Sequence, residues 1–390
     1  MTPAPPLYAQ AVAQQPLIAP PAVPFLDLGP AHAPLKASLL EEIGEIVETG
    51  AFVNGPHVTA FERAFAAYCE TRYCVGVASG LDGLRLALLA AGLEPGDEVL
   101  VPAQTFVATY EAVTQAGGRP LVADVSETDY GLDVNAAAAA LGPRTRFLLP
   151  VHLYGQMADM QALRALADRR GLAIVEDACQ AHGAQRDGLR AGAGGLAAAF
   201  SFYPGKNLGA FGDAGALVTD DEELARRAIA LREHGQSAKY VHDVEGYTAR
   251  LDSIQALVLL RKLALLDTWN EERRAAAAIY DAGLDGVGDL LLPAVAGASE
   301  PVWHLYVART ADPDGLALHL RERGVGTGRH YPHPPHLSPA YESLGHRPGS
   351  FPVAEALAAE CLSLPIFPGI GEERLAAVVA AVADYFRRGR

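Results

Sequence analysis

The residue with the clearest chemical potential is Lys206, which stands in the segment Phe200-Ser-Phe-Tyr-Pro-Gly-Lys-Asn-Leu-Gly-Ala-Phe-Gly-Asp-Ala-Gly215. Short apolar runs flank this segment on both sides, which predicts two buried strands joined by a glycine-rich loop. A lysine on such a loop can be partly desolvated, and desolvation lowers its pKa and frees the amine to attack a carbonyl. A solvated surface lysine is the ordinary alternative, so the interpretation depends on the residues that accompany Lys206.

Three other segments come directly after predicted strands. Ala78-Ser-Gly-Leu-Asp82 passes through glycine into a helix, whose free backbone N–H groups suit a phosphate. Pro102-Ala-Gln-Thr-Phe-Val107 offers Phe106 to cover a planar ring, and Ile174-Val-Glu-Asp-Ala-Cys-Gln-Ala-His182 places two acids and an amide behind a buried strand. Each has a structural alternative when taken alone: a tight turn, a core aromatic, or an acid that caps the next helix.

Taken together, these segments supply what pyridoxal phosphate chemistry requires. That cofactor needs a lysine for a Schiff base and a carboxylate on its ring nitrogen, which makes the ring an electron sink. It also needs a phosphate cradle and a flat side chain against the ring. Because the carboxyl ends of parallel strands meet at one crevice, we expect these residues in a single site.

The elements that must position this site alternate between strands and helices. Strands are predicted at 73–77, 98–101, 120–123, 145–150, 173–175, 196–200 and 216–218, with helices between most of them, which indicates an α/β fold with a mostly parallel sheet covered by helices. One long amphipathic helix is predicted at 251–270, followed by a smaller α+β part with strands at 303–308 and near 324–330. The predicted division is an extension at 1–22, a large domain at 23–250 and a small domain at 251–390.

Composition limits the class of protein. The 390 residues carry 31 basic and 46 acidic side chains, and the resulting net charge of −15 disfavours nucleic acids and anionic membrane surfaces as partners. No apolar run approaches the roughly 20 residues of a spanning helix. The Ala- and Pro-rich residues 1–22 lack the features of a signal peptide and are predicted to be disordered. Four scattered cysteines without zinc-site spacing fit reduced thiols, so we expect a cytoplasmic protein.

From Val23 to its end the chain resembles the DegT/DnrJ-type sugar aminotransferases, which have the type I fold of aspartate aminotransferase. The motifs that carry the resemblance are Ser79-Gly-Leu-Asp82, Pro102-Ala-Gln-Thr-Phe106, Pro150-Val-His-Leu-Tyr-Gly-Gln156, Glu176-Asp-Ala-Cys-Gln-Ala-His182, Ser201-Phe-Tyr-Pro-Gly-Lys-Asn-Leu-Gly209, Gly246-Tyr-Thr-Ala-Arg-Leu-Asp252 and Thr327-Gly-Arg-His-Tyr-Pro332. The resemblance implies a large domain with a seven-stranded sheet, a smaller C-terminal domain and a homodimer with shared active sites.

The resemblance also implies roles for individual residues. Lys206 would bind the cofactor covalently and move protons, and Asp177 would pair with the ring nitrogen. The other implied cofactor contacts are Gln180 to the ring hydroxyl, Phe106 on the ring face, and Ser201 with the backbone of Gly80, Leu81 and Asp82 at the phosphate. The sugar pocket would include His152, Tyr154, His330 and Tyr331, each of which could equally be a packed aromatic residue.

The chain departs from the family pattern in three places. Leu81 stands where threonine is common, so this turn offers only backbone N–H groups, and Cys179 replaces alanine as a small buried residue. Thr248-Ala249 stands where Asn-Ser is usual, and that asparagine reaches the phosphate in the neighbouring subunit. Thr248 is therefore expected to take this role with a shorter reach.

The resulting expectation is an aminotransferase that moves an amino group, by resemblance from glutamate, to a dTDP-linked keto-6-deoxysugar. The lysine loop resembles members that aminate at C-3, and amination at C-4 is the alternative. Lys206 argues against the related sugar 3-dehydratases, which carry histidine there. A cofactor-binding metabolite sensor is the alternative outside catalysis. No metal site is expected, since prolines prevent His330, His333 and His336 from sharing a helix face.

Overall fold

The structure is a computed structural model that describes residues 22–388, so the predicted extension at 1–22 lies almost entirely outside the described residues. At its centre is a seven-stranded sheet in the spatial order β1–β9–β8–β5–β4–β2–β3. The strands are β1 (Tyr73–Val77), β2 (Glu98–Pro102), β3 (Arg119–Ala123), β4 (Thr145–Leu148), β5 (Ala173–Asp177), β8 (Ala197–Ser201) and β9 (Gly215–Thr219). β9 runs antiparallel to both of its neighbours and the other pairs are parallel, which confirms the predicted mostly parallel sheet.

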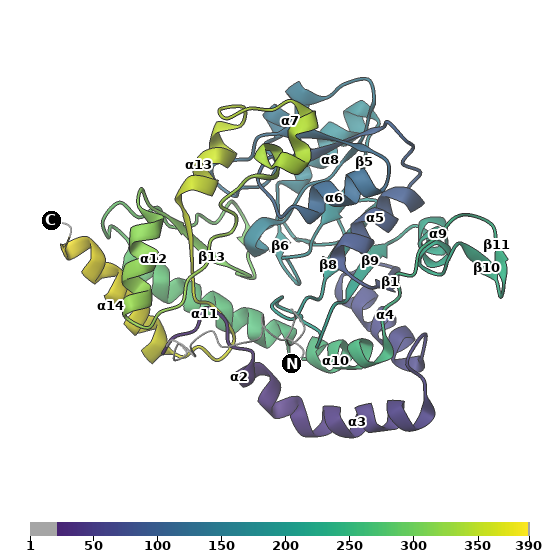
Figure 1. The fold of residues 1–390 in the computed structure, drawn as a ribbon, viewed down its shortest axis with the longest axis horizontal. Helices are drawn as coiled ribbons and strands as arrows, with labels where there is room; N and C mark the ends of the chain where they lie inside the picture. Colours follow the sequence, from purple (N-terminus) through teal and green to yellow (C-terminus); the bar gives the residue numbers. More distant parts are fainter. Residues whose placement is uncertain (1–21, 389–390) are drawn as a thin grey trace, which may run out of the picture.

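Helices cover both faces of this sheet (Figure 1). One face packs against α5 (Gly80–Ala90), α6 (Ala108–Gln115) and α9 (Glu222–Arg232). The other packs against α4 (Pro56–Tyr68), α7 (Val134–Ala140), α8 (Met160–Arg170) and α10 (Ser253–Leu263). Alternate residues of β8 serve the two faces, as strand geometry requires: Ala199 packs on the α5 side and Phe200 on the α4 side.

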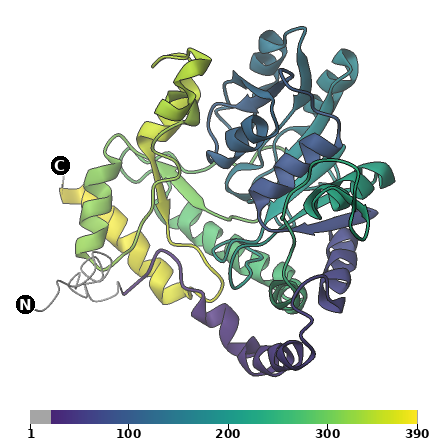
Figure 2. The ribbon, with the colours of Figure 1, turned by 45° about the vertical axis from the view of Figure 1, so that its right-hand side comes forward.

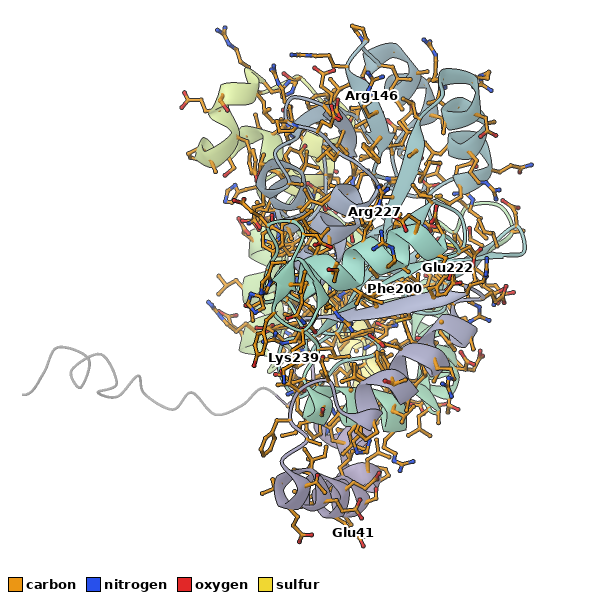
Figure 3. The ribbon with its side chains drawn as sticks, turned by 90° about the vertical axis from the view of Figure 1, so that its right-hand side faces the viewer. Glu41, Arg146, Phe200, Glu222, Arg227 and Lys239 are labelled. Carbon is orange, nitrogen blue, oxygen red and sulfur yellow. The ribbon has the colours of Figure 1, made fainter. Side chains whose placement is uncertain are left out.

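Small residues allow α5 to lie close to the strands that carry the site. A Cβ added at Gly83 would be only 3.0 Å from the Cβ of Ala199 and 3.0 Å from the carbonyl oxygen of Ala216. The run Ala197-Ala-Ala-Phe200 therefore leaves room for the helix to pack on β8. On the outer side, α9 carries the charged residues Glu222 and Arg227 (Figure 3).

The C-terminal third forms a second apolar cluster around α11 (Leu266–Leu284), α12 (Pro313–Glu322) and α14 (Glu372–Arg388), with the antiparallel pair β13 (Tyr306–Arg309) and β14 (Cys361–Leu364). Figure 2 shows this part beside the sheet domain. Val23 belongs to the same cluster, and its N–H donates to Gly324 O at 2.9 Å. The predicted strand near 324–330 forms only isolated bridges, at Val325 and Gly328.

The predicted single helix at 251–270 is wrong, because α10 ends at Leu263 and α11 begins at Leu266. α10 packs against α4 and against α3 (Lys36–Thr49), whereas α11 buries its apolar side in the C-terminal cluster. The division of the chain at 250/251 stays a prediction. We propose instead a boundary at the break between α10 and α11, because α10 packs on the sheet domain and α11 packs in the C-terminal cluster.

The remaining elements are short. They are the helices α2 (Gly29–His32) and α13 (Pro352–Glu360), the strands β6 (Gln185–Arg186), β7 (Leu189–Arg190) and β12 (Ser299–Glu300), the hairpin β10 (Gln236–Ala238) and β11 (Val241–His242), and 3-10 turns at Ala33–Leu35, Leu153–Gly155, Pro335–Leu337 and Pro339–Leu344. The β10–β11 hairpin extends away from the sheet (Figure 1), and Lys239, labelled in Figure 3, lies between its two strands. Within residues 22–388, no helix combines the length and apolar character needed to cross a membrane.

Candidate active site

A cavity of about 460 Å³ opens at the carboxyl ends of β5 and β8, between the sheet and the C-terminal part. This is the position expected for a ligand in an open α/β sheet. Its wall contains most of the residues predicted from sequence, namely Gly80, Leu81, Phe106, Asp177, Gln180, Ser201, Lys206, His330 and Tyr331. Four predicted residues do not line it: Asp82, His152, Tyr154 and Thr248.

Lys206 lies on the loop between β8 and β9. Its backbone N–H donates to Tyr203 O at 2.8 Å, and the next residue, Asn207, is anchored by Nδ2 hydrogen bonds to Asn270 Oδ1 at 2.9 Å and Val302 O at 2.8 Å. Burial lowers the pKa of the Lys206 amine, although nearby Cys179 and Asp177 oppose this shift. Within residues 22–388 its Nζ has no hydrogen bond or ion pair, so the amine is free to react in the cavity.

The loop reaches this shape because its glycines permit close contacts. A Cβ at Gly209 would lie 2.3 Å from the carbonyl oxygen of Pro204, which no side chain could tolerate. The lysine is therefore held on a tight backbone rather than on a mobile segment.

Asp177 ends β5 and is almost fully buried, with 6% of its surface exposed. Its Oδ2 accepts a hydrogen bond from Thr109 Oγ1 at 2.8 Å, and its Oδ1 accepts one from Cys179 N at 3.2 Å. Thr105 Oγ1 lies 2.7 Å from Thr109 Oγ1 and continues this chain of hydroxyl groups. Donors to both oxygens hold the carboxylate in a fixed orientation at the cavity.

Gln180 is oriented by its neighbours. The backbone N–H of Tyr154 donates to Gln180 Oε1 at 2.8 Å, which fixes the carbonyl end of the amide. The Nε2 end donates to Tyr331 Oη at 3.1 Å, toward the cavity. The Tyr154 hydroxyl also donates to His330 O. Tyr154 therefore contacts two residues of the cavity wall but does not itself line the cavity. The prediction that Tyr154 contacts a sugar has no support in this geometry.

The start of α5 provides a cradle of backbone N–H groups. Ser79 caps this helix: its Oγ accepts from Asp82 N at 3.1 Å and donates to Asp82 Oδ2 at 3.0 Å. The N–H of Asp82 therefore already has an acceptor within the chain, and its contact with a phosphate stays a prediction. The N–H groups of Gly80 and Leu81 have no acceptor in the described part of the chain, as is usual in a first helical turn. A Cβ on Gly80 would lie 2.6 Å from Cys179 Sγ and 2.7 Å from Ser201 Cβ, so this approach requires glycine.

His152 belongs to a buried network rather than to the cavity. Its Nε2 lies 2.8 Å from Glu176 Oε2, and its Nδ1 accepts from Ala158 N at 3.2 Å, so the ring proton must be on Nε2. Glu176 also accepts backbone N–H groups of the loop at Gly192, Gly194 and Gly195, at 3.1, 2.7 and 2.7 Å. His152 N donates to Asp177 O at 3.0 Å. The predicted sugar contact of His152 is thus unsupported, and the network instead braces the strand end that bears Asp177.

Several wall residues were not found from the sequence. Phe25 stacks on His330, with ring centroids 5.4 Å apart, and Leu26 lies against Gly205 of the lysine loop. His304 and Arg273 complete the wall on the side of the C-terminal part. Burial lowers the pKa of His330 to about 4, and the positive charge of Lys206 adds to this shift. No local sequence pattern identifies Phe25, Leu26, His304 or Arg273 as site residues, because only the tertiary fold brings them to the cavity.

Phe106 and Thr248 are both exposed. The Phe106 side chain is 51% exposed at the cavity, 5.4 Å from the Tyr331 ring, and so can cover a planar ligand. Thr248 lies outside the cavity of its own chain, with its Oγ1 3.1 Å from His234 Nε2. Its role at a partner subunit's phosphate stays a prediction.

Comparison with known proteins identifies the family of this chain. Residues 34–383 match the family model of the DegT/DnrJ/EryC1/StrS aminotransferase family. The chain is 50% identical over 368 residues, 94% of its length and 97% of the relative's, to a dTDP-3-amino-3,4,6-trideoxy-alpha-D-glucose transaminase of Streptomyces venezuelae. It is also 50% identical over 360 residues, 92% of its length and 98% of the relative's, to the erythromycin biosynthesis sensory transduction protein EryC1 of Saccharopolyspora erythraea.

Solved structures show the same fold. The crystal structure of S. venezuelae DesV in complex with a ketimine intermediate matches with a TM-score of 0.92 and 50% identity, over 95% of this chain and 99% of that one. NtdA of Bacillus subtilis with bound cofactor PMP matches with a TM-score of 0.86 and 32% identity, over 94% of this chain and 85% of that one. The chain therefore belongs to the DegT/DnrJ/EryC1/StrS aminotransferase family, and it is an aminotransferase whose cofactor is pyridoxal phosphate.

The residues of this cavity fit that cofactor. Asp177 offers a fixed carboxylate, the α5 start offers two N–H groups without acceptors, and Gln180 directs its amide N–H groups inward. Ser201 Oγ accepts from Tyr203 N at 3.3 Å and keeps its own proton available for a phosphate oxygen. A free amine, an acid, an amide and a phosphate cradle therefore surround one space.

Proposed function

We propose that this protein transfers the amino group of glutamate to the C-3 ketone of a dTDP-linked keto-6-deoxysugar. The observation that carries the proposal is the single cavity lined by Lys206, Asp177, Gln180 and Ser201. Support for the sugar and for C-3 comes from the printed name of the S. venezuelae relative, a dTDP-3-amino sugar transaminase that is 50% identical over nearly the whole of both chains. Amination at C-4 remains the alternative regiochemistry.

In the proposed mechanism, bound pyridoxal phosphate supplies an electron sink for the charge that develops when the donor's α-carbon loses a proton. Lys206 would hold the cofactor and, once the donor's amine has displaced its Nζ, would move that proton, a task that its lowered pKa suits. Asp177 would place its carboxylate at the ring nitrogen, and Gln180 would donate to the ring hydroxyl. Phe106 would cover one face of the ring, while Gly80, Leu81 and Ser201 would hold the phosphate.

We further propose a homodimer with shared active sites. Thr248 lies outside its own cavity, and exposed apolar side chains gather in segments around it and around the lysine loop: Phe52, Val53, Tyr203, Phe211, Tyr240, Val241 and Val244. A partner subunit would cover these side chains and receive Thr248 at its phosphate. Sedimentation velocity tests the dimer, and a weaker cofactor affinity of Thr248→Ala tests the shared site. The cytoplasm is the proposed compartment because all four cysteines are free thiols.

The experiment for the reaction uses the holoenzyme with glutamate and, separately, dTDP-linked 3-keto and 4-keto-6-deoxyhexoses. Measurement of released 2-oxoglutarate follows the loss of the amino group from glutamate, and mass spectrometry follows the amination of the sugar. Amination of the 3-keto sugar is expected, and preference for the 4-keto sugar would contradict the regiochemistry. Because the EryC1 relative is named a sensory transduction protein, a sensor is the second candidate, and cofactor binding without turnover of either half would favour it.

A further inference from the structure

Arg273 presents an unusual charge in the wall of the cavity. This residue of α11 has only 3% of its surface exposed, yet it lines the cavity. No carboxylate in the described part of the chain lies within ion-pair distance of its guanidinium. A buried cation without an anion is costly, so its presence requires an explanation.

The guanidinium is only partly satisfied by the protein. Its Nη1 donates to three backbone carbonyls, Trp303 O at 3.0 Å, Ile366 O at 2.9 Å and His304 O at 3.4 Å. Its Nε is buried without a partner. The Nη2 group also has no acceptor within residues 22–388. Unlike Nε, it is not fully enclosed by protein atoms. Because Arg273 lines the cavity, Nη2 is the part of its guanidinium that reaches the cavity surface.

Arg273 is the one basic side chain of the described cavity wall that stays positively charged when the cofactor is bound. Burial lowers the pKa of His304 well below its ordinary value and that of His330 to about 4, so both rings are neutral near pH 7. Lys206 is committed to the cofactor under the proposed function. Burial lowers the pKa of Arg273 to about 10, which still leaves it charged.

We infer that Arg273 Nη2 binds a carboxylate of the amino donor. The inference rests on the proposed aminotransferase function, in which an amino acid must enter this cavity beside Lys206. Guanidinium groups match carboxylates in geometry and charge, and a substrate carboxylate would supply the anion that the protein withholds. Because three carbonyls hold Nη1, the group is already oriented before the donor binds.

The test measures binding of glutarate, a five-carbon dicarboxylate without an amine, to the holoenzyme by calorimetry. Arg273→Gln is expected to weaken glutarate binding about 10- to 100-fold, the range for one charged hydrogen-bonded partner. Arg273→Lys should recover part of this loss. Arg274→Gln is the matched control, because Arg274 pairs with Glu271 on the outer side of the same helix and should leave binding unchanged. In turnover, KM for glutamate should rise while KM for the keto-sugar stays within twofold.

Unchanged glutarate binding in Arg273→Gln would overturn the inference, as would failure of the parent holoenzyme to bind glutarate at all. A rise in KM for the keto-sugar alone would assign Arg273 to the sugar nucleotide and overturn it too. Should the variants lose their cofactor or fold, a crystal structure of the parent with glutarate decides, according to whether a carboxylate contacts Nη2. Glutarate binding through Arg273 in an enzyme that aminates neither sugar would refute the proposed substrate and leave this inference standing.

Discussion

The substitution Glu176→Gln tests the buried network behind Asp177. It keeps the size of the side chain and exchanges one acceptor oxygen for an NH₂ donor. Each oxygen of Glu176 accepts two hydrogen bonds, from Gly194 N and Gly195 N on Oε1 and from Gly192 N and His152 Nε2 on Oε2. Either orientation of the glutamine therefore points its NH₂ group at two donors.

His152 cannot relieve this conflict. Moving its proton from Nε2 to Nδ1 would create an acceptor for the new NH₂ group, but Nδ1 would then face the N–H of Ala158, which now donates to it at 3.2 Å. At least two buried donors lose their acceptor in every arrangement. Each such loss costs roughly 1–3 kcal/mol, so the free energy of unfolding should fall by about 2–6 kcal/mol.

The assay is guanidinium unfolding of the cofactor-free protein, followed by circular dichroism, with the midpoint compared between parent and variant. The cofactor dissociation constant should rise as well, because His152 N donates to Asp177 O and helps to fix the strand end. Glu223→Gln is the control, since Glu223 pairs with Arg226 and Arg227 on the exposed side of α9, where ion pairs contribute little. Equal midpoints for the parent and Glu176→Gln would refute the network of four hydrogen bonds described around Glu176.

The remaining predictions concern three other positions. Gly80→Ala should weaken cofactor binding at least tenfold, because the new Cβ would meet Cys179 Sγ at 2.6 Å, whereas Gly44→Ala in α3, with nothing within 4 Å, should stabilise the protein slightly. Asp177→Asn should lower kcat roughly 10²-fold or more, measured with glutamate and the keto-sugar, because it removes a preorganised charge from the ring nitrogen. Burial lowers the pKa of Lys262 from 10.5 to about 8. Between these two pH values the unfolded chain binds more protons than the folded chain, so the free energy of unfolding rises with pH. Lys262→Met should remove this rise, which is worth about 3 kcal/mol between pH 7 and pH 10.5 in unfolding experiments.

Each of these three predictions would be contradicted by one specific outcome. Normal cofactor affinity in Gly80→Ala would mean that α5 does not approach Ser201 as closely as described. Full turnover of Asp177→Asn would remove Asp177 from the mechanism. A pH dependence of stability that is the same in Lys262→Met and the parent would show that Lys262 is not the buried amine responsible.

The sheet and much of the cavity could be predicted because they follow from local rules. All seven strands are short apolar runs bounded by turns, and a parallel sheet brings their carboxyl ends together wherever the chain folds correctly. Asp177 and Lys206 therefore reach one cavity even though 29 positions separate them in the sequence. The capping role of Ser79 is also local: in the sequence Ser79-x-x-Asp82 the serine hydroxyl accepts the N–H of Asp82, which the sequence predicted at the phosphate.

Other features depend on tertiary contacts that leave no local pattern. The apolar spacing continues through Ala264 and Leu265, without glycine or proline, so nothing in the sequence marks the break between α10 and α11. His152 looks like a cavity residue because it follows a strand, but its ring turns to Glu176 behind the wall. Arg273 and Phe25 come from distant parts of the chain, and only the tertiary fold brings them to the cavity wall.

Lys206 is the amine that we propose binds the cofactor. The most direct measurement is borohydride reduction of the protein reconstituted with pyridoxal phosphate, followed by proteolysis and peptide mass spectrometry. We predict one modified residue per chain, Lys206, and no stable label in Lys206→Ala. Lys262 is a stringent internal comparison, because burial also lowers its pKa, to about 8. Modification at Lys262 or at a surface lysine, with Lys206 unmodified, would contradict the account.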